Sequence, residues 1–299
     1  MGTVTGLRTT LVGGLRYRGR EGQWSYILNR VTGLGTLLFL AVHILDTATV
    51  YFIPSLYEHA IDLYRSTPFM LGEIALVAAV LFHGLNGYKI IYFDLDPRRW
   101  NERNEARAFW IVSALSLALW LPAAYFMGRA LYINNICRCA VPGSTGLALP
   151  GWADALIVLA VAASVVGLLR AAARSGPRAG ARLNFETGMW LFMRGSGILL
   201  VPLVWIHVLI NDVLIGVHAI DLNYVAMRWA TWGWRAYDVA LLAFTWAHGL
   251  NGLRSVLLDY VHGPGARRAL PYLLLGGWIL WTAIGAVAIV GGVGIEGQP

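Results

Sequence analysis

The pentapeptide His-Gly-Leu-Asn-Gly occurs twice, at His83–Gly87 and again at His248–Gly252. Each copy lies in an apolar stretch long enough to span a bilayer, where a histidine is costly to place and usually marks a functional site. Asp94 and Asp259 each follow the histidine of their copy by eleven residues. A glycine four residues after a helical histidine lies on the same face and lets a flat ligand approach closely. The two copies therefore predict a metal macrocycle held between two helices.

Composition places the chain in a membrane. Hydrophobic residues make up 58% of its 299 residues and charged residues 13%, against about 25% charged in soluble domains. About thirty polar, Arg-rich residues precede the first apolar run, so we expect no cleavable signal peptide. The predicted fold is an all-α integral membrane bundle of seven transmembrane helices, each near the ~20 residues that a crossing needs. Their predicted ranges are 31–53, 69–93, 108–132, 153–173, 190–216, 236–258 and 271–294.

Positive charge is distributed unevenly about these helices. Of the 23 Lys and Arg residues, eighteen fall on one side and five on the other. The positive-inside rule then places the N-terminus in the cytoplasm and the C-terminus outside. The net charge of +7 is thereby explained by orientation and by anionic membrane lipid, without a nucleic-acid partner.

The repeat extends beyond the pentapeptide. Arg30 precedes His43 by thirteen residues, and Arg194 precedes His207 by the same number. Equivalent positions differ by 164 or 165 residues throughout. Each unit has a first helix with Arg then His, a second with the pentapeptide, and a third with neither signal. We infer two related three-helix units.

Topology requires an extra helix between the units. We divide the chain into a first unit, 1–133, a linker, 134–185, and a second unit, 186–299. Three helices that start inside end outside, yet the second unit also starts inside. The apolar stretch Trp152–Ala173 in the linker therefore returns the chain to the cytoplasm. The units are then parallel, related by an axis near the membrane normal.

The pentapeptide histidines form the pair nearer the cytoplasm, here named the proximal pair. His83 and His248 lie six residues before Lys89 and Arg254, roughly 9 Å along a helix. Imidazole is an axial ligand of haem iron, and two axial histidines leave no open position, which suits electron transfer.

The first-helix histidines form the distal pair. His43 and His207 lie thirteen residues beyond Arg30 and Arg194, roughly 20 Å along a helix. Two stacked haems would make an electron path across the bilayer. Haem propionates need cationic partners, and ordinary interfacial snorkelling remains the alternative for each candidate. The candidates are Arg30, Lys89, Arg194 and Arg254.

The remaining polar residues give weaker signals. His59, His218 and His262 fall in or near loops, where we expect solvated side chains. Cys137 and Cys139 are two residues apart, so a bridge would be strained and we expect none. Three carboxylates lie in the outer half of the membrane. They could form a proton route or a second quinone pocket; alternatively, they face a water-filled outer vestibule or pair with Arg228 or Arg235. They are Asp46, Glu73 and Asp212.

These residues carry a resemblance to a known family. The run from Ser25 to Gly33, Ser-Tyr-Ile-Leu-Asn-Arg-Val-Thr-Gly, leads to His43 and His83 and resembles the larger cytochrome b anchor subunit of succinate dehydrogenases. The second unit, with its Arg, its two His and the Asp-Tyr pair at 259–260, resembles the smaller anchor subunit. The chain looks like both anchors fused, a departure from the usual two-chain pattern.

The resemblance implies roles for individual residues. The proximal pair would ligate the haem nearer the iron–sulfur subunit, and the distal pair a second haem b. The quinone site would use Arg30 and Tyr260, since a guanidinium and a phenol stabilise the anionic oxygen of a quinone under reduction. The family's serine aligns with Tyr26 rather than Ser25. Residues close enough to contribute to the site are Trp24, Ser25, Tyr26, Asn29 and Asp259.

The predicted function is the di-haem membrane anchor of a succinate:quinone oxidoreductase, respiratory complex II, in a bacterial cytoplasmic membrane. It would dock a flavoprotein and an iron–sulfur subunit and reduce menaquinone or ubiquinone, alone or in a higher oligomer. The chain has no dinucleotide fingerprint and no cysteine cluster, so succinate chemistry belongs to partners. One alternative is the cytochrome b anchor of another quinone-linked dehydrogenase, and a second is a parallel-repeat transporter whose histidines relay protons. A third is an anchor without haem, but the four intramembrane histidines argue against it.

Overall fold

A computed structural model describes residues 20–139 and 184–294, and every regular element in those ranges is helical. The long helices are α2 (Glu21–Phe52), α4 (Thr67–Asp94), α5 (Glu102–Leu131), α7 (Phe185–Val208), α9 (Trp232–Leu257) and α10 (Pro264–Gly291). The short elements are α3 (Pro54–Tyr64), η1 (Pro97–Arg99), the π-helical η2 (Tyr132–Ile136) and η3 (Leu209–Ile215), η4 (Val217–Ala219) and α8 (Leu222–Arg228).

Five of the described helical stretches are long and apolar enough to cross a membrane, so the chain is a multi-pass membrane protein. They are Glu21–Phe52, Thr67–Asp94, Glu102–Ile136, Phe185–Ile215 and Pro264–Gly291. Helix α9 has 26 residues, about 39 Å at ~1.5 Å per residue, but is not among the five. The predicted span 153–173 lies outside the described residues. The seven-helix count and the parallel repeat therefore stay predictions.

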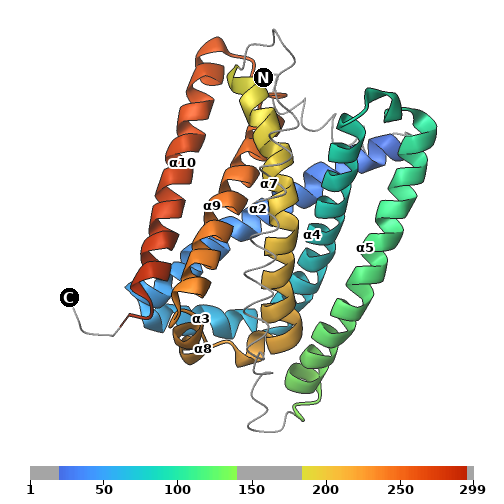
Figure 1. The fold of residues 1–299 in the computed structure, drawn as a ribbon. Helices are drawn as coiled ribbons and strands as arrows, with labels where there is room; N and C mark the ends of the chain where they lie inside the picture. Colours follow the sequence, from blue (N-terminus) through green and yellow to red (C-terminus); the bar gives the residue numbers. More distant parts are fainter. Residues whose placement is uncertain (1–19, 140–183, 295–299) are drawn as a thin grey trace.

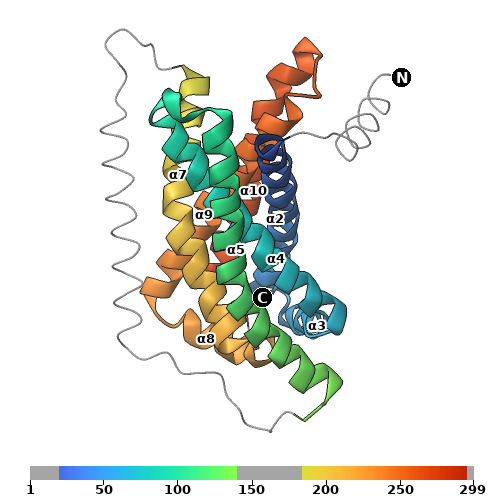
Figure 2. The ribbon, with the colours of Figure 1, turned by 90° about the vertical axis from the view of Figure 1, so that its right-hand side faces the viewer.

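The six long helices form one bundle whose centre is made by the histidine-bearing helices. Helix α2 packs against α4, α9 and α10, while α7 packs against α9 and α4. Helices α5 and α10 lie on opposite flanks (Figures 1 and 2). Helices α2, α5, α7 and α10 begin at one end, here named the basic end because most of the described arginines lie there. The opposite end is named the far end.

The far end carries two short helices that the sequence did not reveal, α3 and α8 (Figure 1). Pro54 starts α3, where a missing N–H costs nothing. Asp221 starts α8, because its side chain accepts a hydrogen bond from the Tyr224 N–H at 2.8 Å. Each short helix lies between the first and second long helix of its unit. Neither is long enough to show a hydrophobic period in the sequence.

The expectation that Cys137 and Cys139 stay unbridged was wrong. The structure joins them in a disulfide, with their Cα atoms 5.2 Å apart, inside the usual range of about 4.4–6.8 Å. The residue between them, Arg138, has φ of 54°, a left-handed conformation that turns the chain back on itself. This turn was not visible in the residue spacing alone.

Candidate functional site

A cavity of about 830 Å³ runs between α2, α4, α7 and α9. Both predicted histidine pairs line it, and the surface of its wall is mostly apolar. Its volume is at the upper end of the range for ligand sites, about 300–1,000 Å³. The structure thus brings together the four intramembrane histidines that the sequence singled out.

The proximal pair is held with one nitrogen of each ring already engaged. The ring centroids of His83 and His248 are 6.5 Å apart, at an interplanar angle of 88°. Nδ1 of His83 lies 3.0 Å from the backbone oxygen of Asn29, to which it must donate. Nδ1 of His248 lies 2.8 Å from Oγ of Ser196, which itself donates to the Phe192 carbonyl at 2.6 Å. Both Nδ1 atoms therefore carry the proton, which leaves both Nε2 lone pairs for a ligand.

The distal pair is less constrained. The rings of His43 and His207 have centroids 6.1 Å apart, at an angle of 76°. His43 stacks on Phe39 at 5.3 Å. Nδ1 of His207 is buried without a hydrogen-bond partner among the described residues. A buried polar atom without a partner is unusual, and His207 lines the cavity.

The donor set at each level suits a haem. Two ring centroids 6.1–6.5 Å apart leave room for one ion, because an imidazole–metal bond is about 2 Å long. No group of three or more His, Cys, Asp or Glu in residues 20–139 and 184–294 is arranged to hold a metal ion. Two facing imidazoles at each level are the protein ligand set of a bis-histidine haem.

Glycines make the walls close enough for a flat ligand. A Cβ on Gly87 would meet nothing within 4 Å, and Gly87 lines the cavity, as the pentapeptide predicts. A Cβ on Gly33 would lie 2.7 Å from Cε1 of His83, so glycine is required there for the ring to fit. The repeat counterpart, Gly197, has His248 Cε1 at 3.7 Å. Neither glycine was predicted to line the site, although the repeat places each of them three residues after an arginine.

Two ion pairs link the units at the basic end. Arg30 Nη1 lies 2.7 Å from Asp259 Oδ2, and Arg194 Nη2 lies 2.5 Å from Asp94 Oδ2. In each pair the arginine comes from one unit and the aspartate from the other, at equivalent repeat positions. Both arginines line the cavity.

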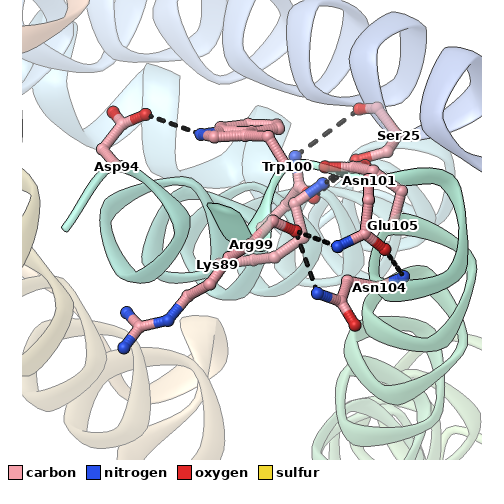
Figure 3. Close-up of polar contacts among 9 residues, drawn as sticks. Ser25, Lys89, Asp94, Arg99, Trp100, Asn101, Asn104 and Glu105 are labelled. Atoms are coloured by element: carbon pink, nitrogen blue, oxygen red, sulfur yellow. Dashed lines mark hydrogen bonds and ion pairs between the residues drawn. The ribbon is translucent and has the colours of Figure 1, made fainter. Parts of the chain in front are cut away.

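The other two propionate candidates lie differently. Lys89 is buried and does not line the cavity; it donates to Ser25 Oγ at 2.7 Å and Glu105 at 3.1 Å (Figure 3). Arg254 is likewise buried and pairs with Glu186. Their role toward propionates stays a prediction, and both cations already have a carboxylate partner.

Two of the predicted quinone residues, Tyr26 and Asp259, contact Arg30. Its guanidinium carbon lies 4.2 Å from the ring centroid of Tyr26. Tyr260 is the residue after Asp259, which pairs with Arg30, and 37% of Tyr260 is exposed. Ser25, in contrast, is buried and donates to Asn86 at 2.8 Å, so its hydroxyl faces the protein. Trp24 is exposed on the same helix turn, and Oδ1 of Asn29 is buried without a partner among the described residues.

The outer carboxylates Asp46, Glu73 and Asp212 all line the cavity. Tyr64 of α3 donates to Asp46, and burial, with this hydrogen bond adding, raises the pKa of the Tyr64 phenol. Arg228 pairs with none of the three: it forms a buried ion pair with Asp238 at 2.7 Å, a partner that the residue spacing did not predict. Arg235 binds backbone carbonyl oxygens instead.

Fold and cavity together define a multi-pass helical membrane protein with histidines facing a buried site. Residues 14–123 and 177–289 match the succinate dehydrogenase/fumarate reductase transmembrane subunit family. These residues are more than half of the chain, and the chain belongs to that family. The predicted resemblance is thus confirmed, and the chain is a membrane subunit of an oxidoreductase of electron transport. The succinate dehydrogenase 2 membrane subunit SdhC of Mycobacterium tuberculosis is 38% identical over 114 residues, 38% of this chain and 81% of that protein.

Proposed function

We propose that this chain is the fused cytochrome b anchor of a succinate:quinone oxidoreductase, holding two b haems and a quinone site. The observation that carries the proposal is the arrangement of His43, His83, His207 and His248 as two facing pairs along one cavity. The two stretches matched by the family, one on either side of the linker, support a fusion of both anchors.

The chain's own residues would hold and orient the prosthetic groups. Asn29 and Ser196 fix the tautomer and direction of the proximal imidazoles, as outer partners of metal-bound histidine do. Arg30 and Arg194 line the cavity. There each guanidinium could stabilise the negative charge of a haem propionate in a low-dielectric setting. When bound, the two haems would supply one-electron transfer across the membrane.

Quinone would bind at the basic end beside Arg30. The guanidinium and the Tyr260 hydroxyl would donate hydrogen bonds to the quinone carbonyl oxygens and stabilise negative charge there during reduction. Arg30 is only partly covered, with 28% of its side chain exposed, so a headgroup can reach it. Tyr260 can also pass its proton to the reduced oxygen.

The basic end would face the cytoplasm of a bacterium and dock a flavoprotein and an iron–sulfur subunit. The positive-inside rule supports this orientation, and membrane subunits of this family serve soluble partners that carry the dicarboxylate chemistry. The test is purification of the whole complex: the three kinds of subunit should co-purify with haem absorbance and succinate:quinone reductase activity. Co-purification with a different dehydrogenase, or an absence of haem absorbance, would overturn the proposal.

A further inference from the structure

Arg30 and Arg194 hold equivalent positions in the two units, yet the structure secures them differently. Each pairs with an aspartate of the other unit and each lies over an aromatic ring, Tyr26 at 4.2 Å and Trp190 at 4.4 Å. Their side chains are equally covered, with 28% and 27% exposed. The difference lies in the aspartates.

Asp94 holds Arg194 through several contacts. Its Oδ2 accepts from Arg194 Nε at 3.0 Å and Nη2 at 2.5 Å. Its Oδ1 accepts from the indole Nε1 of Trp100 at 3.2 Å, with the indole directed at the carboxylate (Figure 3). Only 17% of the Asp94 side chain is exposed. Both carboxylate oxygens are thus engaged, and the guanidinium has little freedom.

Asp259 holds Arg30 through one contact of 2.7 Å, and 49% of its side chain is exposed. Within the described residues no other side chain donates to this carboxylate. Such a pair is screened by water and easily exchanged. Arg30 is therefore able to release its partner when a substrate enters.

The asymmetry comes from the connection that follows each second helix. After α4, the 3₁₀ turn Pro97–Arg99 presents Trp100, whose ring also meets Phe93 edge-on at 5.2 Å. After α9, the link to α10 contains no tryptophan. Moreover, Leu95 occupies the position equivalent to Tyr260, so the Arg194 side lacks the phenol.

We propose that Asp94, held by Trp100, is a positioning residue that locks Arg194 at the cavity rim as the fixed cation for a propionate of the proximal haem. This rests on the proposed di-haem function. Among the described residues no contact engages Nη1 of Arg194, which leaves donors for a second carboxylate. A fixed cation suits a permanently bound group, whereas the loosely held Arg30 suits quinone, which arrives and leaves.

The test is a redox titration of both haems in the intact complex carrying Asp94→Asn. Loss of the carboxylate leaves the charge of Arg194 uncompensated, which favours the reduced iron. The midpoint potential of the proximal haem should rise, that of the distal haem should stay, and Asp94→Glu should restore the wild-type value. Selective loss of the proximal haem would equally support the lock.

Two further variants sharpen the result. Trp100→Phe keeps the contact with Phe93 but frees Asp94 Oδ1, so it should raise the same potential by less; it also decides the matter if Asp94→Asn does not assemble. Asp259→Asn is the matched control: it should raise the KM for quinone with a smaller change in potential. Unchanged potentials and haem content in Asp94→Asn and Trp100→Phe, or equal shifts of both haems, would overturn the inference. A wild-type complex without two haems would instead overturn the proposed function.

Discussion

Ser196 accepts a hydrogen bond from Nδ1 of His248 at 2.8 Å and donates its own hydroxyl hydrogen bond to the backbone oxygen of Phe192. This chain of two hydrogen bonds decides the tautomer of His248. His83 obtains the same result from a backbone oxygen, that of Asn29. In both proximal histidines Nδ1 is engaged, and the Nε2 lone pair stays available for a ligand.

We predict that Ser196→Ala weakens haem binding at the proximal site. His248 would lose the partner that fixes its tautomer, and loss of such outer partners costs about 10–100-fold in metal affinity. The measurement is haem retention by the purified complex during dilution. Ser196→Thr keeps the hydroxyl and serves as the control. Equal retention in wild type and Ser196→Ala would contradict the role of Ser196 in orienting His248.

Tyr260→Phe should reduce quinone reductase activity strongly and leave haem content unchanged. The substitution removes one hydroxyl donor to the reduced oxygen, and the loss of a single such donor lowers kcat by about 10²–10³-fold in well-studied sites. Steady-state turnover with a soluble quinone measures it. Tyr272→Phe, at an exposed tyrosine near the same end, is the matched control. Full turnover in Tyr260→Phe would place the quinone elsewhere.

The topology makes a prediction at the C-terminus. If the linker crosses the membrane once, a reporter fused after Pro299 lies outside the cytoplasm. Two fusions after Pro299 are compared, one to an enzyme that is active only outside the cytoplasm and one to an enzyme that is active only in the cytoplasm. We expect activity from the first fusion alone. Cytoplasmic activity would contradict the seven-helix arrangement.

The outer carboxylates lead to a prediction about coupling. Asp46 and Glu73 line the distal part of the cavity, where buried carboxylates often carry protons. We expect an uncoupler to change quinol-linked turnover in proteoliposomes, and Asp46→Asn and Glu73→Gln to reduce that response. Glu58→Gln, at an exposed residue of α3, should behave as wild type. If neither the uncoupler nor the two substitutions changes the turnover rate, these carboxylates have only a structural role.

The sequence predicted what depends on long apolar runs and on repetition. Five of the predicted spans coincide with helices that qualify as crossings, and the four histidines meet in one cavity because their spacing repeats. The reciprocal pairs of Arg30 with Asp259 and Arg194 with Asp94 involve residues that the repeat had already aligned.

Other features depend on the approach of distant segments, which spacing does not encode. Lys89 meets Glu105 and Arg254 meets Glu186 only once α5 and α7 are placed. The bridge between Cys137 and Cys139 depends on one left-handed residue. Helices α3 and α8 are too short for their period to be read from the sequence.

The most direct test of the central claim is haem quantified per chain, from a reduced-minus-oxidised spectrum of wild type and of His43→Ala. Four histidines in two facing pairs predict two b haems per chain in the wild type. They predict one in His43→Ala, because the distal site loses a ligand and the proximal site keeps both. One haem or none in the wild type would contradict the account.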